Sequence, residues 1–537
     1  MNKVWKIVSI VVVSLLVACS GDNSVNDIDT SEVAEAENFN KEGFPIVDEP
    51  ITLHFMAGKH ATHADDYNEV TIWKEYEKLT NIEIEWEMMP REGLEEKRNL
   101  ALAGGNLPDV FYTSYMPNSD LIKYGQQGVF VTLNDYIEEY MPNLSTILEE
   151  NPDIRKGITF PDGNIYALPT IYDPEFPSLL IGSRSWINKD WLDKLGMDLP
   201  ETTDEFYEYL KAVKETDLTG NGENDEIPFG STTIAGLRQH LAGAFGINTN
   251  GRNHLFIDTD PETNEMRFFP ASERYKEMLE YLNKLYSEGL IHENIYTIDT
   301  NQSYAIGSEG RYGSITAPNP ETIYGEAGKS FVGLPALEGP YGDRAFTDIG
   351  SPLIHLGGFV VTSENEHIPE TLRWMDYFYS DEGTKLYFMG VEGLTYEETE
   401  DGLEYVDEIM NNPDGLTMEQ ALKPHITWLG GGYPGYVKQD VFNGAETLPS
   451  SIESAEALAP YLIEDIWSNF TYTVEESQRK AALSADIEKY VNEMQDKFIT
   501  GNISFSEWDN YIETIEKMGL EEYMEIEQAA YERYMEE

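Results

Sequence analysis

One short segment of the chain places oxygen-bearing side chains at the spacing of a calcium-binding loop. It begins at Asp217 and reads DLTGNGENDE. A calcium ion takes six to eight oxygen ligands, and an EF-hand loop supplies them from alternate positions with a glycine at its sharp turn. Gly222 stands at that glycine position. The spacing predicts a structural calcium site whose ligands are Asp217, Thr219, Asn221, Glu223 through its carbonyl, Asp225 and Glu226.

This loop departs from an EF-hand at its last position, where Pro228 replaces the bidentate glutamate. Glu226 is the nearby residue that offers a carboxylate instead. Asp, Asn and Gly are also the residues that form solvated turns. A turn without a metal ion therefore stays open as the alternative.

The only cysteine of the chain, Cys19, follows a short basic and then apolar segment. Lys3 and Lys6 precede residues 7–18, which are apolar apart from two serines. Twelve residues are too few to span a membrane of about 30 Å as a helix, but they suit a secretory signal. Residues 16–19 resemble a bacterial lipobox, in which the signal is cut before the cysteine and the thiol receives a lipid. We therefore expect a signal peptide over 1–18 and a lipid-anchored, flexible tether over 19–45.

The composition limits what kind of partner the protein binds. It has 36 Lys+Arg against 98 Asp+Glu, which gives a formal net charge of −62. Such a charge opposes binding to nucleic acid. A single cysteine excludes an intramolecular disulfide and any cysteine-cluster metal site. Because 41% of 537 residues are hydrophobic, the chain can build two large lobes or two to four domains.

Alternating strands and helices begin the folded part. Strand patterns at 51–56, 82–86 and 110–111 are separated by helical patterns at 68–79 and 94–103. This order predicts an α/β lobe with a parallel sheet. Further patterns predict short strands at 165–171 and 179–181, helices at 189–195, 203–214, 272–288 and 369–379, and a mostly helical C-terminal region.

Several segments resemble the family 1 extracellular solute-binding proteins of ABC importers, in particular a large LplA-like branch. They match in the family's order along the chain. The segments are ALAGGNLPDV at 101–110, INKDWLDKLG at 187–196, YLNKLYSEGLI at 281–291, WMDYFYSDEG at 374–383 and the C-terminal stretch 511–534.

The resemblance implies an α/β, two-lobed periplasmic-binding-protein-like fold of type II with a helical C-terminal extension. We expect residues 46–170 with about 305–345 to form lobe 1. About 171–304 with 358–480 form lobe 2, and 481–537 are helices that pack on the lobes. The resemblance also implies that the acidic loop is similar to the structural calcium loop of alginate-binding relatives.

The implied function is a lipid-anchored, non-enzymatic protein at the extracytoplasmic face of the cell membrane. It captures an oligosaccharide between its lobes and delivers it to the permease subunits of an ABC transporter. We expect a monomer that touches the membrane only through its lipid.

Sugars stack on aromatic rings while polar groups bind their hydroxyls, so aromatic residues next to strands or glycines are ligand candidates. Tyr112 and Tyr115 follow the strand at 110–111. Trp428 and Tyr433 lie in the glycine-rich segment WLGGGYPGY. The last two candidates, Arg184 and Trp186, follow the expected crossing between lobes.

Two other function classes remain open at this stage. One is an extracellular carbohydrate-active enzyme, a lyase or glycosidase that uses paired carboxylates. The other is a peptide-binding lipoprotein. The sequence contains no G-x-S-x-G, H-E-x-x-H or P-loop motif. His60 and His63 in HATH are a weak metal signal, and a solvated loop is the simpler interpretation.

Overall fold

The computed structural model describes residues 38–60, 63–400 and 402–536. Cys19, the predicted signal segment and residues 19–37 of the predicted tether lie outside these ranges.

Residues 38–45 were expected in the tether. That expectation is wrong, because Phe39 pairs with Val47 and Arg373 donates to the carbonyl of Asn40 at 3.0 Å. Within the described ranges, no helix is both long and apolar enough to cross a membrane.

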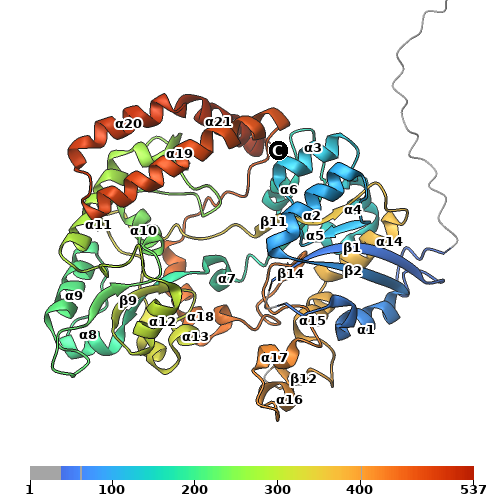
Figure 1. Cartoon of the computed structure of the whole chain (residues 1–537), viewed down its shortest axis with the longest axis horizontal. Coiled ribbons are helices and arrows are strands. Elements are labelled where there is room, and N and C mark those ends of the chain that lie inside the picture. Colours follow the sequence, from blue (N-terminus) through green and yellow to red (C-terminus); the bar gives the residue numbers. More distant parts are fainter. Residues whose placement is uncertain (1–37, 61–62, 401, 537) are drawn as a thin grey trace, which may run out of the picture.

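The central sheet of lobe 1, on the right in Figure 1, consists of β1 (Ile51–Lys59), β2 (Ile82–Pro90), β3 (Val110–Tyr112), β4 (Leu168–Tyr172), β11 (Leu353–Val361) and β14 (Gly435–Val437). Their order across the sheet is β14-β4-β11-β3-β1-β2. β1 pairs in parallel with β2 and β3, and β4 pairs in parallel with β14, while β11 runs antiparallel to its neighbours. Five strands of this sheet therefore end at one edge, and β11 begins there.

The helices of lobe 1 are α1 (Thr71–Thr80), α2 (Arg91–Gly104), α3 (Asn118–Gln126), α4 (Asn134–Tyr140), α5 (Pro142–Glu150), α6 (Pro152–Ile158), α14 (Ile368–Asp376), α15 (Asp381–Met389), α16 (Asp407–Met410) and α17 (Met418–Leu422), with a hairpin of β12 (Tyr396–Thr399) and β13 (Gly402–Tyr405). α1 shows why the amphipathic pattern becomes a helix. Ile72, Trp73 and Tyr76 lie on one face and are buried in the core of the lobe.

Lobe 2 has a four-stranded sheet of β5 (Arg184–Asn188), β6 (Ile227–Gly230), β9 (Tyr312–Ala317) and β10 (Phe331–Gly333). The order is β10-β5-β9-β6. Around it lie the hairpin β7 (Ile257–Thr259) and β8 (Met266–Phe268) and the helices α8 (Lys189–Leu195), α9 (Thr203–Glu215), α10 (Ala235–Ala242), α11 (Glu273–Ser287), α12 (Thr300–Ser308), α13 (Pro320–Tyr324) and α18 (Pro449–Leu458). α9 begins where the sequence predicted, because Thr202 and Glu205 form a capping box.

The expected two-lobed α/β fold is confirmed, but residues 305–345 and the part of 358–480 before α18 were assigned to the wrong lobe, while α18 lies in lobe 2 as expected. Residues 305–345 contain β9 and β10, which pair with β5 of lobe 2. Residues 358–480 contain the last four residues of β11 and all of β14, and these pair with β3 and β4 of lobe 1. Strand pairing joins segments far apart in the chain, so local patterns do not reveal the partner.

The segment 179–181 was predicted as a strand and is helical instead. It forms the end of α7 (Pro177–Ile181), which lies on the connection between the lobes in Figure 1. Pro177 occupies the first helical turn, where its missing N–H costs nothing and its fixed φ favours a helix. Three apolar residues cannot by themselves distinguish a strand from a buried helical turn.

The C-terminal helices α19 (Val474–Thr500), α20 (Trp508–Lys517) and α21 (Leu520–Glu536) lie along lobe 2 and reach lobe 1 (Figure 1). Their buried faces belong to the same apolar cluster as α9 and α11. On the side of lobe 1, the Thr471 hydroxyl donates to the Thr159 carbonyl at 2.8 Å, and Lys156 lies 5.8 Å from the ring centre of Tyr534. The helical layer therefore contacts both lobes.

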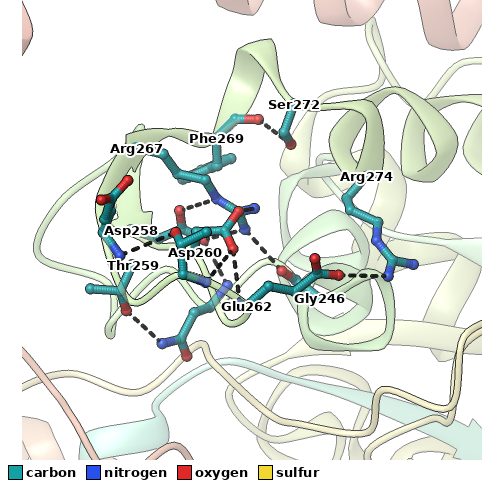
Figure 2. A network of polar contacts seen from close by, with 12 residues as sticks. Gly246, Asp258, Thr259, Asp260, Glu262, Arg267, Phe269, Ser272 and Arg274 are labelled. Atoms are coloured by element: carbon teal, nitrogen blue, oxygen red, sulfur yellow. Dashed lines mark hydrogen bonds and ion pairs between the residues drawn. The ribbon is translucent and has the colours of Figure 1, made fainter.

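A buried ion pair holds the β7–β8 hairpin of lobe 2. Figure 2 shows the Arg267 guanidinium between Asp258 and Asp260, at 2.8 Å from Asp258 Oδ1 and 2.5 Å from Asp260 Oδ2. It also donates to the Gly246 carbonyl at 2.9 Å. The Asp258 side chain is fully buried. Its burial raises the pKa of Asp258 even though Arg267 pulls in the opposite direction.

We expect Arg267→Met to lower the free energy of unfolding by about 3–5 kcal/mol, because it leaves the Asp258 carboxylate buried without its cation. Urea unfolding measures the change. The double variant R267M/D258N also removes the unpaired carboxylate of Asp258 and should be less destabilised than R267M alone. The exposed ion pair of Arg479 and Glu522 provides the control, since Arg479→Met should leave the free energy of unfolding nearly unchanged. Equal losses in R267M and R479M would contradict this account.

Candidate functional site

Three segments that follow parallel strands of lobe 1 meet at one edge of its sheet. His60 comes directly after β1, Arg91 directly after β2, and Tyr115 shortly after β3. The His60 Nε2 atom lies 2.9 Å from the Tyr115 hydroxyl and 2.6 Å from Arg91 Nη1. A guanidinium has only donors, so His60 Nε2 accepts the hydrogen bond from Arg91. The Arg91 guanidinium also lies over the Tyr115 ring, 4.4 Å from its centre.

The turn that carries Tyr115 has an unusual backbone. Thr113 and Tyr115 have φ values of 45° and 52°, in the left-handed region that side chains with a Cβ seldom adopt. Arg98, which is buried in α2, donates from Nη1 to the carbonyls of Ser114 at 2.9 Å and Tyr115 at 2.8 Å. Such strain persists only where surrounding contacts hold it, and it is typical of functional sites.

The indole of Trp428 forms the aromatic side of the same site. It is half-buried and stacks on the buried ring of His63, with 4.8 Å between ring centres and 29° between planes. The Nδ1 atom of His63 lies 2.8 Å from the Tyr67 hydroxyl. Burial, with the nearby cationic groups, lowers the pKa of His63 to about 4. The imidazole is therefore neutral at pH 7.

Next to Tyr115 is a pocket of about 270 Å³. Its lining combines hydroxyl, amide, imidazole and glycine positions, among them Thr113, Asn118, Thr170, His355, Gly432 and Asn469. His355 is exposed at the start of β11, with its ring centre 6.1 Å from that of Tyr115. Polar donors beside exposed aromatic faces are what an oligosaccharide site requires.

A larger hollow of about 790 Å³ lies beside α2 and the β1–β2 edge. Its aromatic lining residues, Phe55 and Trp86, are 0% and 6% exposed, so neither ring offers a face for stacking. Its charged groups already pair with one another, His54 with Glu85 at 2.9 Å and Lys97 with Glu87 at 3.1 Å. The smaller pocket is therefore the better candidate.

Of the six ligand candidates from the sequence, the structure brings Tyr115 and Trp428 to this site and excludes two other aromatic rings of lobe 1. Tyr112 is 2% exposed and packs among Phe55, Trp86 and Phe359. Tyr433 is 1% exposed and stacks on Tyr387 with 3.8 Å between ring centres. Both rings belong to the core, because β3 is buried on both faces and Tyr433 faces inward from its loop.

The two candidates in lobe 2 are also buried. Trp186 is fully buried and donates from Nε1 to the Ala317 carbonyl at 2.9 Å. Arg184 is 1% exposed, and its guanidinium binds the carbonyls of Ser178 and Ser451, each at 2.6 Å. Burial lowers the pKa of Arg184 to about 10. Arg184 thus links α7 to α18.

The sequence analysis missed Arg91 and His355 and treated His60 only as part of a weak metal motif. A signal for His60 and Arg91 was present, since each follows a predicted strand and ligands bind at the carboxyl ends of parallel strands. His355 had no such signal, because it is placed here by long-range pairing of β11 with β4. Among the described residues, no three acidic, imidazole or thiol groups converge as a metal site.

The acidic loop at 217–226 folds as a tight turn. The Asp217 carboxylate accepts backbone N–H groups of Gly220 at 2.6 Å and Gly222 at 2.9 Å, which lowers the pKa of Asp217. Glu226 is buried and accepts two backbone N–H groups through Oε1, while its Oε2 has no hydrogen-bond partner. The Asp225 carboxylate lies 3.0 Å from Arg311. The side chains keep oxygen atoms of the type that calcium prefers, and Glu226 Oε2 has no hydrogen-bond partner.

Comparison with known proteins identifies the family. The model of the bacterial extracellular solute-binding protein family matches residues 61–385. The chain belongs to this family. It is 30% identical over 97% of its length to the fructooligosaccharide ABC transporter substrate-binding protein FusA of Streptococcus pneumoniae, of which 96% is covered. It is 28% identical over 84% of its length to the polygalacturonan/rhamnogalacturonan-binding protein YtcQ of Bacillus subtilis, of which 87% is covered.

Solved structures of solute-binding proteins are also similar to this chain. This family member superposes on FusA in complex with kestose with a TM-score of 0.72 at 29% identity, covering 90% of this chain and 99% of that one. An extracellular solute-binding protein from Bifidobacterium longum subsp. infantis has a TM-score of 0.77 at 23% identity, with 90% and 98% covered, which supports the fold. The relatives are substrate-binding proteins of the two-lobed type.

The neutral, buried His63 predicts a dependence of stability on pH. Its pKa is lowered from 6.5 to about 4 on folding. Its contribution to stability is therefore complete above pH 6.5 and is lost as the pH falls toward 4. We expect His63→Gln to lose less free energy of unfolding than the wild type between pH 7.5 and pH 4.5, as measured by urea unfolding.

The control for this measurement is His54→Gln, which changes an exposed histidine. We expect H54Q to follow the wild-type pH dependence. If H63Q and the wild type lost the same stability over this interval, His63 would not be a neutral core histidine.

Proposed function

We propose that this protein is the substrate-binding component of an ABC importer and captures an oligosaccharide at the Tyr115–Trp428 site. The observation that carries the proposal is the half-buried Trp428 indole near the His60–Arg91–Tyr115 cluster, in which Tyr115 also lines a pocket with several polar groups. The ring offers a face for the apolar side of a sugar, while Arg91, His60 and the Tyr115 hydroxyl bind its oxygens. FusA, the relative named above, is a fructooligosaccharide-binding protein with the same architecture.

The mechanism we propose is closure of the two lobes around the sugar. The chain passes between the lobes along α7, before β11 and after β14, and these segments are hydrogen-bonded to one another. The Tyr172 N–H donates to the Pro352 carbonyl at 2.8 Å, and the Asp173 N–H donates to the Val437 carbonyl at 3.0 Å. A ligand that contacts both lobes favours the closed state by its higher affinity for that state. The closed form then delivers the sugar to the permease subunits.

We further propose that the protein is a monomer held at the extracytoplasmic face of the cell membrane by a lipid on Cys19, without enzymatic activity. Lipid anchoring is supported by the lipobox-like residues before Cys19 and by the relative Lipoprotein LipO of Bacillus subtilis, which is 27% identical over 84% of this chain. The acidic stretch after Cys19 would keep the lobes away from the membrane surface.

Substitution of the site aromatics tests the binding proposal. We expect Trp428→Ala and Tyr115→Ala each to weaken binding of the preferred oligosaccharide at least tenfold, about 1.4 kcal/mol, because each removes a stacking face. Calorimetry with a panel that includes kestose measures the affinity. Tyr341→Ala removes an exposed aromatic ring of lobe 2 and should leave the affinity unchanged. Chromatography of the recovered sugar decides the class, since product formation would show an enzyme.

We also propose that Asp217, Thr219, Asn221, Glu223, Asp225 and Glu226 hold a structural calcium ion. The support is the oxygen spacing and the partnerless Oε2 of buried Glu226. The ion would join the end of α9 to the start of β6 through ligands from both sides of the turn. Its role would be to stabilise lobe 2, because the Tyr115–Trp428 site is formed by lobe 1.

Removal of calcium tests this site. We expect EDTA to lower the Tm and added Ca²⁺ to restore it, with a gain of about 2.7 kcal/mol at a calcium concentration 100 times Kd. Asp217→Asn should weaken the calcium response. Asp414→Asn, in another exposed turn, is the matched control and should keep it. A Tm that does not respond to calcium in the metal-stripped wild type would remove the site.

A further inference from the structure

The candidate site concentrates basic side chains in a strongly acidic protein. The whole chain has 36 Lys+Arg against 98 Asp+Glu. Yet the groups around Tyr115 and Trp428 are basic or imidazole side chains: Lys59, His60, His63, Arg91, Arg98 and His355. Random placement of charges in this composition would favour carboxylates instead. Lys59, Arg91 and Arg98 therefore give the site cationic groups within a molecule of strongly negative net charge.

The charges that act on the site groups are positive. The electrostatic fields of His60, Lys59 and Lys423 act on His63, and the field of Arg91 acts on His355. Asp65 faces solvent and lies 3.3 Å from Lys423, which offsets its charge. Elsewhere on lobe 1 the sign is reversed, since Asp173, Glu150 and Glu175 act on Tyr436. The charged groups that act on His63 and His355 are thus cationic, in contrast to those that act on Tyr436.

Arg91 has donors available for a ligand. Among the described residues it forms no ion pair, and its hydrogen bond to His60 Nε2 uses one of five N–H groups. The guanidinium is placed by its contact with the Tyr115 ring at 4.4 Å, so it loses little freedom on binding. Arg98 also lacks an ion pair in the described part of the chain, but it is buried and holds the Tyr115 turn. Arg91 is the ligand-binding group and Arg98 a positioning residue.

From this arrangement we propose that the site selects oligosaccharides that carry an anionic group, a uronate carboxylate or a sulfate ester, and that Arg91 binds the anion. This inference rests on the proposed function. A guanidinium binds carboxylate and sulfate oxygens through paired, charge-assisted hydrogen bonds, while Trp428 contacts the sugar ring. A net charge of −62 repels an anionic glycan at long range, so its capture needs a local cluster of cations.

Calorimetry on the full chain tests the inference with three probes, namely trigalacturonate, a sulfated disaccharide and neutral kestose. We expect at least one anionic probe to bind at least tenfold more tightly than kestose, and its affinity to fall as NaCl rises from 50 to 500 mM. Comparison of trigalacturonate with the sulfated disaccharide shows whether the site prefers a carboxylate or a sulfate ester. We expect Arg91→Gln to weaken binding of the anionic probe at least tenfold and binding of kestose less than threefold. Arg91→Lys should retain part of the selectivity.

Arg479→Gln, in an exposed ion pair on α19, is the matched control and should leave all affinities unchanged. Equal binding of kestose and the anionic probes, or equal losses for all of them in R91Q, would overturn the charge selectivity and leave oligosaccharide binding intact. If no oligosaccharide of a wider panel bound, the proposed function would fail and this inference with it. Calorimetry therefore separates the two failures.

Discussion

The parallel pairing of β1 with β2 and β3 is the constraint on which the site depends. Backbone hydrogen bonds fix the register over nine residues of β1, from Ile51 opposite Ile82 to Lys59 opposite Pro90. Strands in parallel register must end at the same edge, and the residues that follow them meet there. His60, Arg91 and Tyr115 come together for this reason. The hydrogen bonds among them are a consequence of the sheet, and the pocket beside Tyr115 lies where the neighbouring strand β11 begins.

The many acidic residues and the few arginines of this protein have different roles. The acidic surplus keeps the molecule soluble and spreads over both lobes and the C-terminal helices. Cations are retained at specific places, such as Arg267 in the β7–β8 hairpin and Arg184 between α7 and α18. Each of these neutralises or satisfies buried acceptors. Arg91 differs, because it is exposed and has no carboxylate partner in the described part of the chain.

The sequence predicted the first lobe well and the assignment of later segments poorly. Helices α8 and α9 begin at the predicted residues, because Asn188 and Thr202 cap their first turns. The same local reasoning failed for β9 and β14, whose partners are distant in the chain. Aromatic residues near glycines were reasonable ligand candidates, but Tyr433 turns inward onto Tyr387 while Trp428, from the same segment, remains half-exposed. Side-chain direction at these positions follows from packing between elements.

The sequence by itself determined the features that depend on neighbouring residues: helix caps, strand alternation, the oxygen spacing after Asp217 and the lipobox-like residues before Cys19. It also determined the family, because the matching segments keep their order. Only the tertiary structure decided that His355 lies beside Tyr115, that Arg184 is a structural link and that Arg91 lies over the Tyr115 ring. The physical reason is that burial and strand pairing join residues far apart in the chain, and no local pattern records which distant surface a side chain will meet.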